Sequence, residues 1–182
     1  MDGAKQPTVN TQGFISTEKP EPEKVEPAEN SNGDGAFVKP VNGIWTSTLT
    51  PLADYTCDWH RWCSQKHYGL TEESKLWALE PREDVEVFVI ESQNDLILLL
   101  DEFERDENDG AISPLDDRYI DFEAMAELYD GIRLTEEAQW KTRMTRPSLY
   151  GWDCESTVWF DWAFSDVQRK QTIGEDFVER DC

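Results

Sequence analysis

The chain has 182 residues, which suits one domain, since domains usually contain about 100–200 residues. It carries 17 Lys and Arg against 39 Asp and Glu, a formal net charge of -22. This charge repels phosphate backbones, so it argues against direct nucleic-acid binding and favours a basic protein partner.

The longest dense apolar run spans 95–103, far below the roughly 20 residues that a membrane helix needs. The N-terminus shows no signal-peptide pattern either. We therefore expect a cytoplasmic protein without membrane contact, in which the four cysteines are free thiols.

Residues 1–36 are rich in Pro, Glu, Lys, Asn and Gly, and Phe14 is their only aromatic residue. Such a composition buries too little apolar surface to offset the entropy of ordering. We expect a disordered or extended acidic arm that orders only on a partner. A globular domain over 37–165 and a polar tail over 166–182 would follow.

The first half of the domain predicts two strands and one helix. β-branched and aromatic residues predict a strand at 43–47. A helix is expected over 54–69, because Trp59, Trp62 and Cys63 share one face, with Asp54 or Thr56 as N-cap and Gly69 as its end. Val85, Val87 and Val89 alternate with Glu86, Phe88 and Ile90. This alternation predicts the second strand, with one buried face.

The second half alternates helices with short strands. Ser92 or Asn94 would cap a helix whose apolar stripe comprises Leu96, Leu99, Leu100 and Phe103. It is followed by a loop over 106–120, a short helix from Asp121 and a strand near 131–135. After these come a helical turn from Thr135 and a strand over 156–164. This order predicts an α+β fold, a compact mixed sheet of short strands with packed helices.

Four metal-capable side chains, Cys57, His60, Cys63 and His67, lie within eleven residues. On one helix they would extend over about 15 Å at the usual rise, which is too long for one tetrahedral centre. We therefore expect Cys63 in the core, partly exposed histidines, and no metal site.

Two polar motifs are candidate binding elements. The hydroxyls of Thr46, Ser47 and Thr48 follow a strand, where they either maintain sheet geometry or bind polar groups of a ligand. Asp153 and Glu155 immediately precede the strand at 156–164. A carboxylate there is rigidly placed, and it either stabilises an oxocarbenium-like ribose or is a solvated strand end.

These motifs resemble those of ADP-ribosyltransferases, which combine a cationic or His residue on the first strand, a Ser/Thr-rich strand and a late Glu. Here 45–48 is similar to the second motif and 153–160 to the third, and the resemblance covers 43 to about 162. It implies an ADP-ribosyltransferase-like fold and transfer of ADP-ribose from NAD to a macromolecular target. The catalytic residues would be Glu155 and Asp153, and the NAD-binding residues Trp45, Thr46, Ser47, Tyr150 and Arg143.

One part of the family pattern is missing. Residues 1–42 contain no Arg and no His. Either the order of the elements differs from that of the family, or Arg143 or Arg146 holds NAD, or the site is inactive and the fold is retained as a binding or structural module. In the alternative interpretation, Arg143 and Arg146 simply offset local acids such as Glu136.

The sequence blocks are also similar to small proteins encoded by bacteria and their phages. That resemblance implies the cytoplasm of a bacterial host or the virion. The alternative function is a non-enzymatic acidic interaction or structural protein: a virion component, a host-factor inhibitor or a nucleic-acid mimic.

Overall fold

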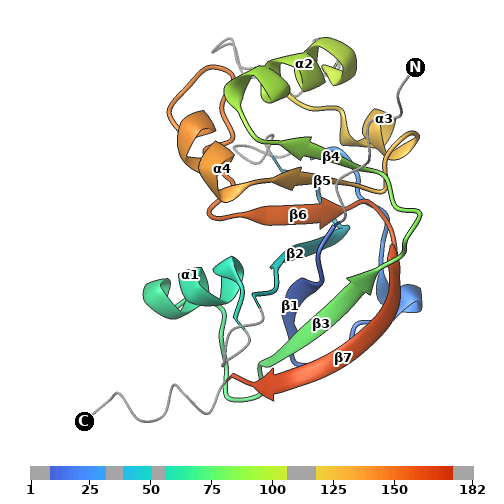
Figure 1. The fold of residues 1–182 in the computed structure, drawn as a ribbon, viewed down its shortest axis with the longest axis vertical. Helices are drawn as coiled ribbons and strands as arrows, with labels where there is room; N and C mark the ends of the chain where they lie inside the picture. Colours follow the sequence, from blue (N-terminus) through green and yellow to red (C-terminus); the bar gives the residue numbers. More distant parts are fainter. Residues whose placement is uncertain (1–8, 32–38, 51–55, 106–117, 174–182) are drawn as a thin grey trace.

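The computed structural model describes residues 9–31, 39–50, 56–105 and 118–173, and Figure 1 shows how they fold. The strands are β1 (Gln12–Ser16), β2 (Ile44–Thr48), β3 (Lys75–Pro81), β4 (Val87–Ile90), β5 (Gly131–Leu134), β6 (Ser156–Trp159) and β7 (Phe164–Thr172). The helices are α1 (Asp58–Lys66), α2 (Gln93–Phe103), α3 (Phe122–Ala126), α4 (Glu136–Thr142) and the short 3-10 helix η1 (Pro22–Lys24).

The strands form one mixed sheet in the order β4-β5-β6-β2-β1-β3-β7. β4 and β5 are parallel, and α2 and α3 lie in the crossover that a parallel pair requires. The other neighbours are antiparallel. The α+β class, with a mixed sheet of short strands and packed helices, is thereby confirmed.

Helix α2 illustrates how the main core forms. The Ser92 side chain accepts a hydrogen bond from the Asp95 N–H and so caps the helix. The predicted stripe is buried, and it packs with residues of the neighbouring helices and strands, among them Ile132, Met125 and Trp152. This core covers one face of the β4-β5-β6 half of the sheet.

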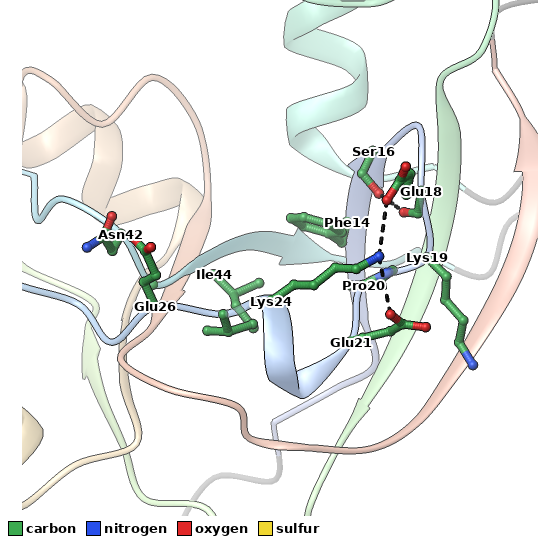
Figure 2. Close-up of a pocket in the computed structure, with 12 residues that line it drawn as sticks. Phe14, Ser16, Glu18, Lys19, Pro20, Glu21, Lys24, Glu26, Asn42 and Ile44 are labelled. Carbon is green, nitrogen blue, oxygen red and sulfur yellow. Dashed lines mark hydrogen bonds and ion pairs between the residues drawn. The ribbon is translucent and has the colours of Figure 1, made fainter.

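A second buried cluster is formed by Ile44, Trp77, Leu79, Trp159, Ala163 and Phe164. Phe14 and Val25 of the N-terminal segment pack against it. Figure 2 shows the surface pocket left between β1, β2 and η1, about 330 Å³ in volume, with Lys24 reaching across it. Lys24 Nζ lies 3.1 Å from Glu18 and 3.2 Å from Glu21, so its charge is neutralised inside this segment.

The structure corrects the expectation of a disordered arm for Gln12–Ser16. This segment is β1, in the interior of the sheet between β2 and β3. The buried Gln12 side chain accepts a hydrogen bond from the Thr46 hydroxyl at 2.7 Å. Hydrogen bonds to β2 on one side and to β3 on the other stabilise this polar strand. The average composition of 1–36 does not include these bonds, so it predicted disorder wrongly for this segment. Residues 1–8 and 32–36 lie outside the described residues.

The tail predicted from residue 166 is also corrected, because β7 continues to Thr172 and pairs with β3. An edge strand tolerates polar residues on its solvent face, which explains why this strand was missed. Residues 174–182 lie outside the described residues.

Several element boundaries differ from the prediction. α1 starts at Asp58 rather than at 54, and it ends at Lys66, because His67 takes a left-handed conformation (φ 52°). β3 was not predicted as a separate strand, and the strand expected over 156–164 is divided into β6 and β7.

Candidate functional site

Three tryptophans line a pocket of about 310 Å³ over β1 and β2, here called the aromatic pocket. Trp45 comes from β2, Trp59 from α1 and Trp152 from the loop before β6. The Trp45 and Trp152 rings meet edge to face, with centroids 4.8 Å apart. Lys39 Nζ lies 5.6 Å from the Trp45 centroid and 3.1 Å from Asp153 Oδ2. The pocket therefore combines aromatic walls with an ion pair at its edge.

The Glu155 carboxylate is held at the start of β6, with its side chain only 6% exposed. The Thr48 N–H donates to Oε2 at 2.8 Å, and the Thr48 hydroxyl donates to Oε1 at 2.8 Å. Arg133 Nε donates to Oε1 at 3.2 Å. Burial of a carboxylate is tolerated because these three donors and the Arg133 charge compensate for lost hydration.

The order of the strands explains this convergence. β6 lies between β5 and β2, and Thr157 is paired with Arg133 on one side and with Thr46 on the other. Glu155, two residues before Thr157, consequently lies opposite Thr48, and Arg133 is its diagonal neighbour on β5, within reach of a long side chain.

The hydroxyls of Thr46 and Ser47 both form internal hydrogen bonds. Ser47 donates to the Glu155 carbonyl at 2.8 Å and accepts from the Trp59 N–H at 3.2 Å, so it connects β2 to β6 and α1. Thr46 accepts from Trp159 Nε1 at 2.9 Å and is buried within the sheet. Thr46 and Ser47 line the aromatic pocket, but their hydroxyls are already engaged in these internal hydrogen bonds.

A second cavity of about 280 Å³ lies between α1 and α4, here called the helix groove. Figure 1 shows both helices on the same side of the sheet, at the end where β6 begins. Asp153 and Cys154 line both cavities, while Glu155 lines the helix groove. Trp62 faces this groove, and it stacks on Trp59 with centroids 5.0 Å apart. The two cavities are therefore neighbours that share a wall.

The structure does not place Arg143 and Tyr150 at the aromatic pocket or the helix groove. The Arg143 guanidinium lies 4.8 Å from the Tyr150 ring, and Tyr150 is 61% exposed. Neither side chain lines the aromatic pocket or the helix groove. The cation beside Glu155 is instead Arg133, which sequence reasoning missed, as it missed the role of Thr48. The alternation of side chains along a strand predicts which face of 131–134 carries Arg133. It does not predict that Glu155 is the partner of Arg133, because this depends on β5 lying next to β6.

Burial disfavours the thiolate form of three cysteines, of which Cys57 and Cys63 are buried and Cys154 is partly buried. Burial raises the pKa of Cys57 to about 12 and that of Cys63 to about 11. Burial also raises the pKa of Cys154. In the described ranges, no group of three or more His, Cys, Asp and Glu side chains is arranged to hold a metal ion.

No family model, curated protein or solved structure matches the chain. None of the helices in the described ranges has the length and apolar character needed to cross a membrane.

Proposed function

We propose that the protein is an ADP-ribosyltransferase-like enzyme that binds NAD and transfers ADP-ribose to a macromolecular target. The observation that carries this proposal is the convergence of Arg133, Thr48, Ser47 and Glu155 from three neighbouring strands. A cation, a Ser/Thr-bearing strand and a glutamate are the parts that the resemblance requires. Arg133 supplies a cation from a later strand than expected, and it acts on Glu155 rather than on NAD, since it lines neither the aromatic pocket nor the helix groove.

The aromatic pocket is suited to the ring end of NAD. Its volume of about 310 Å³ falls within the range of small-molecule sites, and tryptophan walls favour a planar ring. Lys39 is the one cation among the described residues that line it, and it would face the diphosphate. Trp45 and Trp59 would hold the nicotinamide, and Asp153 would orient the incoming nucleophile.

Glu155 would stabilise the positive charge that develops on the ribose as the bond to nicotinamide lengthens. Its carboxylate is already fixed by Thr48 and Arg133, so little reorganisation is needed. Arg133 would act as a positioning residue, because its Nε–H donates to Glu155 Oε1 and fixes the carboxylate.

The test is NAD titration and NAD cleavage with the wild type, Glu155→Gln and the control Glu72→Gln, an exposed turn residue. We expect saturable quenching of Trp fluorescence in all three proteins. Cleavage should fall by about a hundredfold in Glu155→Gln and stay unchanged in the control. Wild-type cleavage by Glu155→Gln, or no saturable binding by the wild type, would refute the proposal.

A second candidate function, an interaction protein without catalysis, is favoured by exposed apolar side chains. Trp140 is 72% exposed, Met144 84% and Tyr150 61%. Exposed aromatic and Met side chains are enriched where proteins dock. The net charge of -22 indicates a basic partner for a virion component, a host-factor inhibitor or a nucleic-acid mimic. Either function would operate in the cytoplasm of a bacterial host or in the virion.

A further inference from the structure

The helix groove has aromatic side chains from both helices. Trp62 extends from α1 and Trp140 from α4, and both line the groove. One face of Trp62 is covered by Trp59, whereas Trp140 is 72% exposed although it belongs to a well-packed helix. Ala138 and Gln139 on the same helix are buried, so the exposure of Trp140 is local and not a sign of a loosely held helix.

The groove is also acidic. Its charged lining residues are Asp58, Arg61, Glu136, Asp153 and Glu155. Arg61 is the single cation among the described lining residues, and it is ion-paired with Asp58.

The carboxylates retain capacity for another cation. Glu136 is exposed at the start of α4, and no ion pair of it is found among the described residues. Asp153 uses Oδ2 for Lys39, which leaves Oδ1 as an acceptor. Aromatic walls combined with carboxylates are the chemistry that recognises an ammonium or guanidinium group, which is attracted to the negative ring face.

We propose that the helix groove binds a Lys or Arg side chain of a basic peptide segment in a partner protein. The cationic head lies against Trp140, near Glu136 and Asp153, and the aliphatic stem packs along Trp62. This inference rests on the interaction role proposed above and not on NAD chemistry.

Charge complementarity selects this occupant. The net charge of -22 steers basic segments toward the molecule and repels a nucleic-acid strand or a second copy of the chain. An anionic occupant would also have to displace Asp58 from Arg61 to find a cation in the groove. A basic peptide meets no such obstacle.

The experiment measures fluorescence polarisation of a labelled peptide of alternating Arg and Gly with the full-length protein. Matched peptides carry Lys or Gln in place of Arg. We expect saturable binding of the Arg and Lys peptides that weakens with added salt, and no binding of the Gln peptide. Trp140→Ala should weaken binding about threefold to thirtyfold, and Glu136→Gln by a few-fold.

Two controls separate the groove from the general acidity of the protein. Leu128→Ala removes another exposed apolar side chain, and Glu72→Gln another exposed acid. Neither should change peptide affinity. Arg61→Gln should strengthen binding, because it removes the competing cation and frees Asp58.

Equal binding of the Gln peptide, equal loss in Leu128→Ala, or weaker binding by Arg61→Gln would overturn the inference. NAD titration of the same variants makes the failures distinguishable. If NAD quenching is normal and no cationic peptide binds, the groove inference alone fails. If peptide binding follows Trp140 and Glu136 while NAD does not bind, the enzyme proposal alone fails. Unchanged NAD quenching or far-ultraviolet circular dichroism in Trp140→Ala confirms that the variant is folded.

Discussion

The pair of Arg133 and Glu155 gives the sharpest prediction about what holds the start of β6. Arg133→Met removes the cation and leaves the carboxylate, 6% exposed, with only the two Thr48 donors. Breaking a fully buried pair costs about 3–5 kcal/mol. Arg133 is 21% exposed, so water relieves part of this cost, and we expect a loss of about 2–3 kcal/mol in the free energy of unfolding.

Glu155→Gln should cost about 1–3 kcal/mol, because the amide oxygen still accepts from the Thr48 N–H but the NH₂ group cannot accept from Arg133 Nε–H. The double variant Arg133→Met/Glu155→Gln removes both charges. It should therefore be more stable than the sum of the single losses predicts, by about 1 kcal/mol or more.

Urea unfolding followed by Trp fluorescence measures these losses, since Trp152 and Trp159 are fully buried and report on the core. Arg118→Met is the matched control, because its ion pairs with Asp101 and Glu104 lie at the surface. We expect it to lose less than about 1 kcal/mol. Strict additivity of the two single substitutions, within about 0.5 kcal/mol, would refute the idea that the charges at Arg133 and Glu155 depend on each other.

Three further predictions concern the fold. Gly43→Ala should destabilise by about 2 kcal/mol or more in urea unfolding, since Gly43 has φ +70° and a Cβ there would lie 2.6 Å from the Trp159 carbonyl oxygen. Stability should fall as pH rises above about 9, because burial raises the pKa values of Cys57 and Cys63 to about 12 and about 11, so the unfolded chain releases these protons first. The urea midpoint measured against pH checks this, and Cys57→Ala should flatten the decline. Deletion of residues 1–16 should abolish the cooperative unfolding transition, because it removes the strand between β2 and β3; a sharp transition in the deletion variant would contradict the role of β1.

Local patterns predicted the elements whose signals are local. Ser92 and the leucine stripe after it gave α2, and Thr135 gave the start of α4, since helix periodicity and capping act within a few residues. β1 was missed because its stability comes from β2 and β3, which are distant in sequence. A composition average over 1–36 cannot detect hydrogen bonds that other strands supply.

The candidate site was predictable only in part for the same reason. Glu155 and Ser47 were chosen from their positions beside strands, and the structure does bring them together. The cation that would hold NAD was sought at Arg143 or Arg146, neither of which lines the aromatic pocket or the helix groove, and the cation that the structure places beside Glu155 is Arg133. Strand order and register, which place β5 next to β6, determine this pairing, and neither can be read from the residues around Arg133.

The distribution of charge links the two proposals. Cations are scarce in this chain, yet Lys39, Arg61 and Arg133 are all ion-paired with acids at or near the start of β6. Each of these ion pairs offsets one acid, but four acids against one cation still line the helix groove, and the whole molecule repels anions at long range. Added salt screens this long-range term over about 10 Å at 0.1 M. NAD, an anion, should consequently bind more tightly as salt rises from a low concentration, whereas a basic peptide should bind more weakly. Parallel titrations of both ligands against NaCl test this, and salt responses of the same sign would mean that the two ligands do not experience the field inferred here.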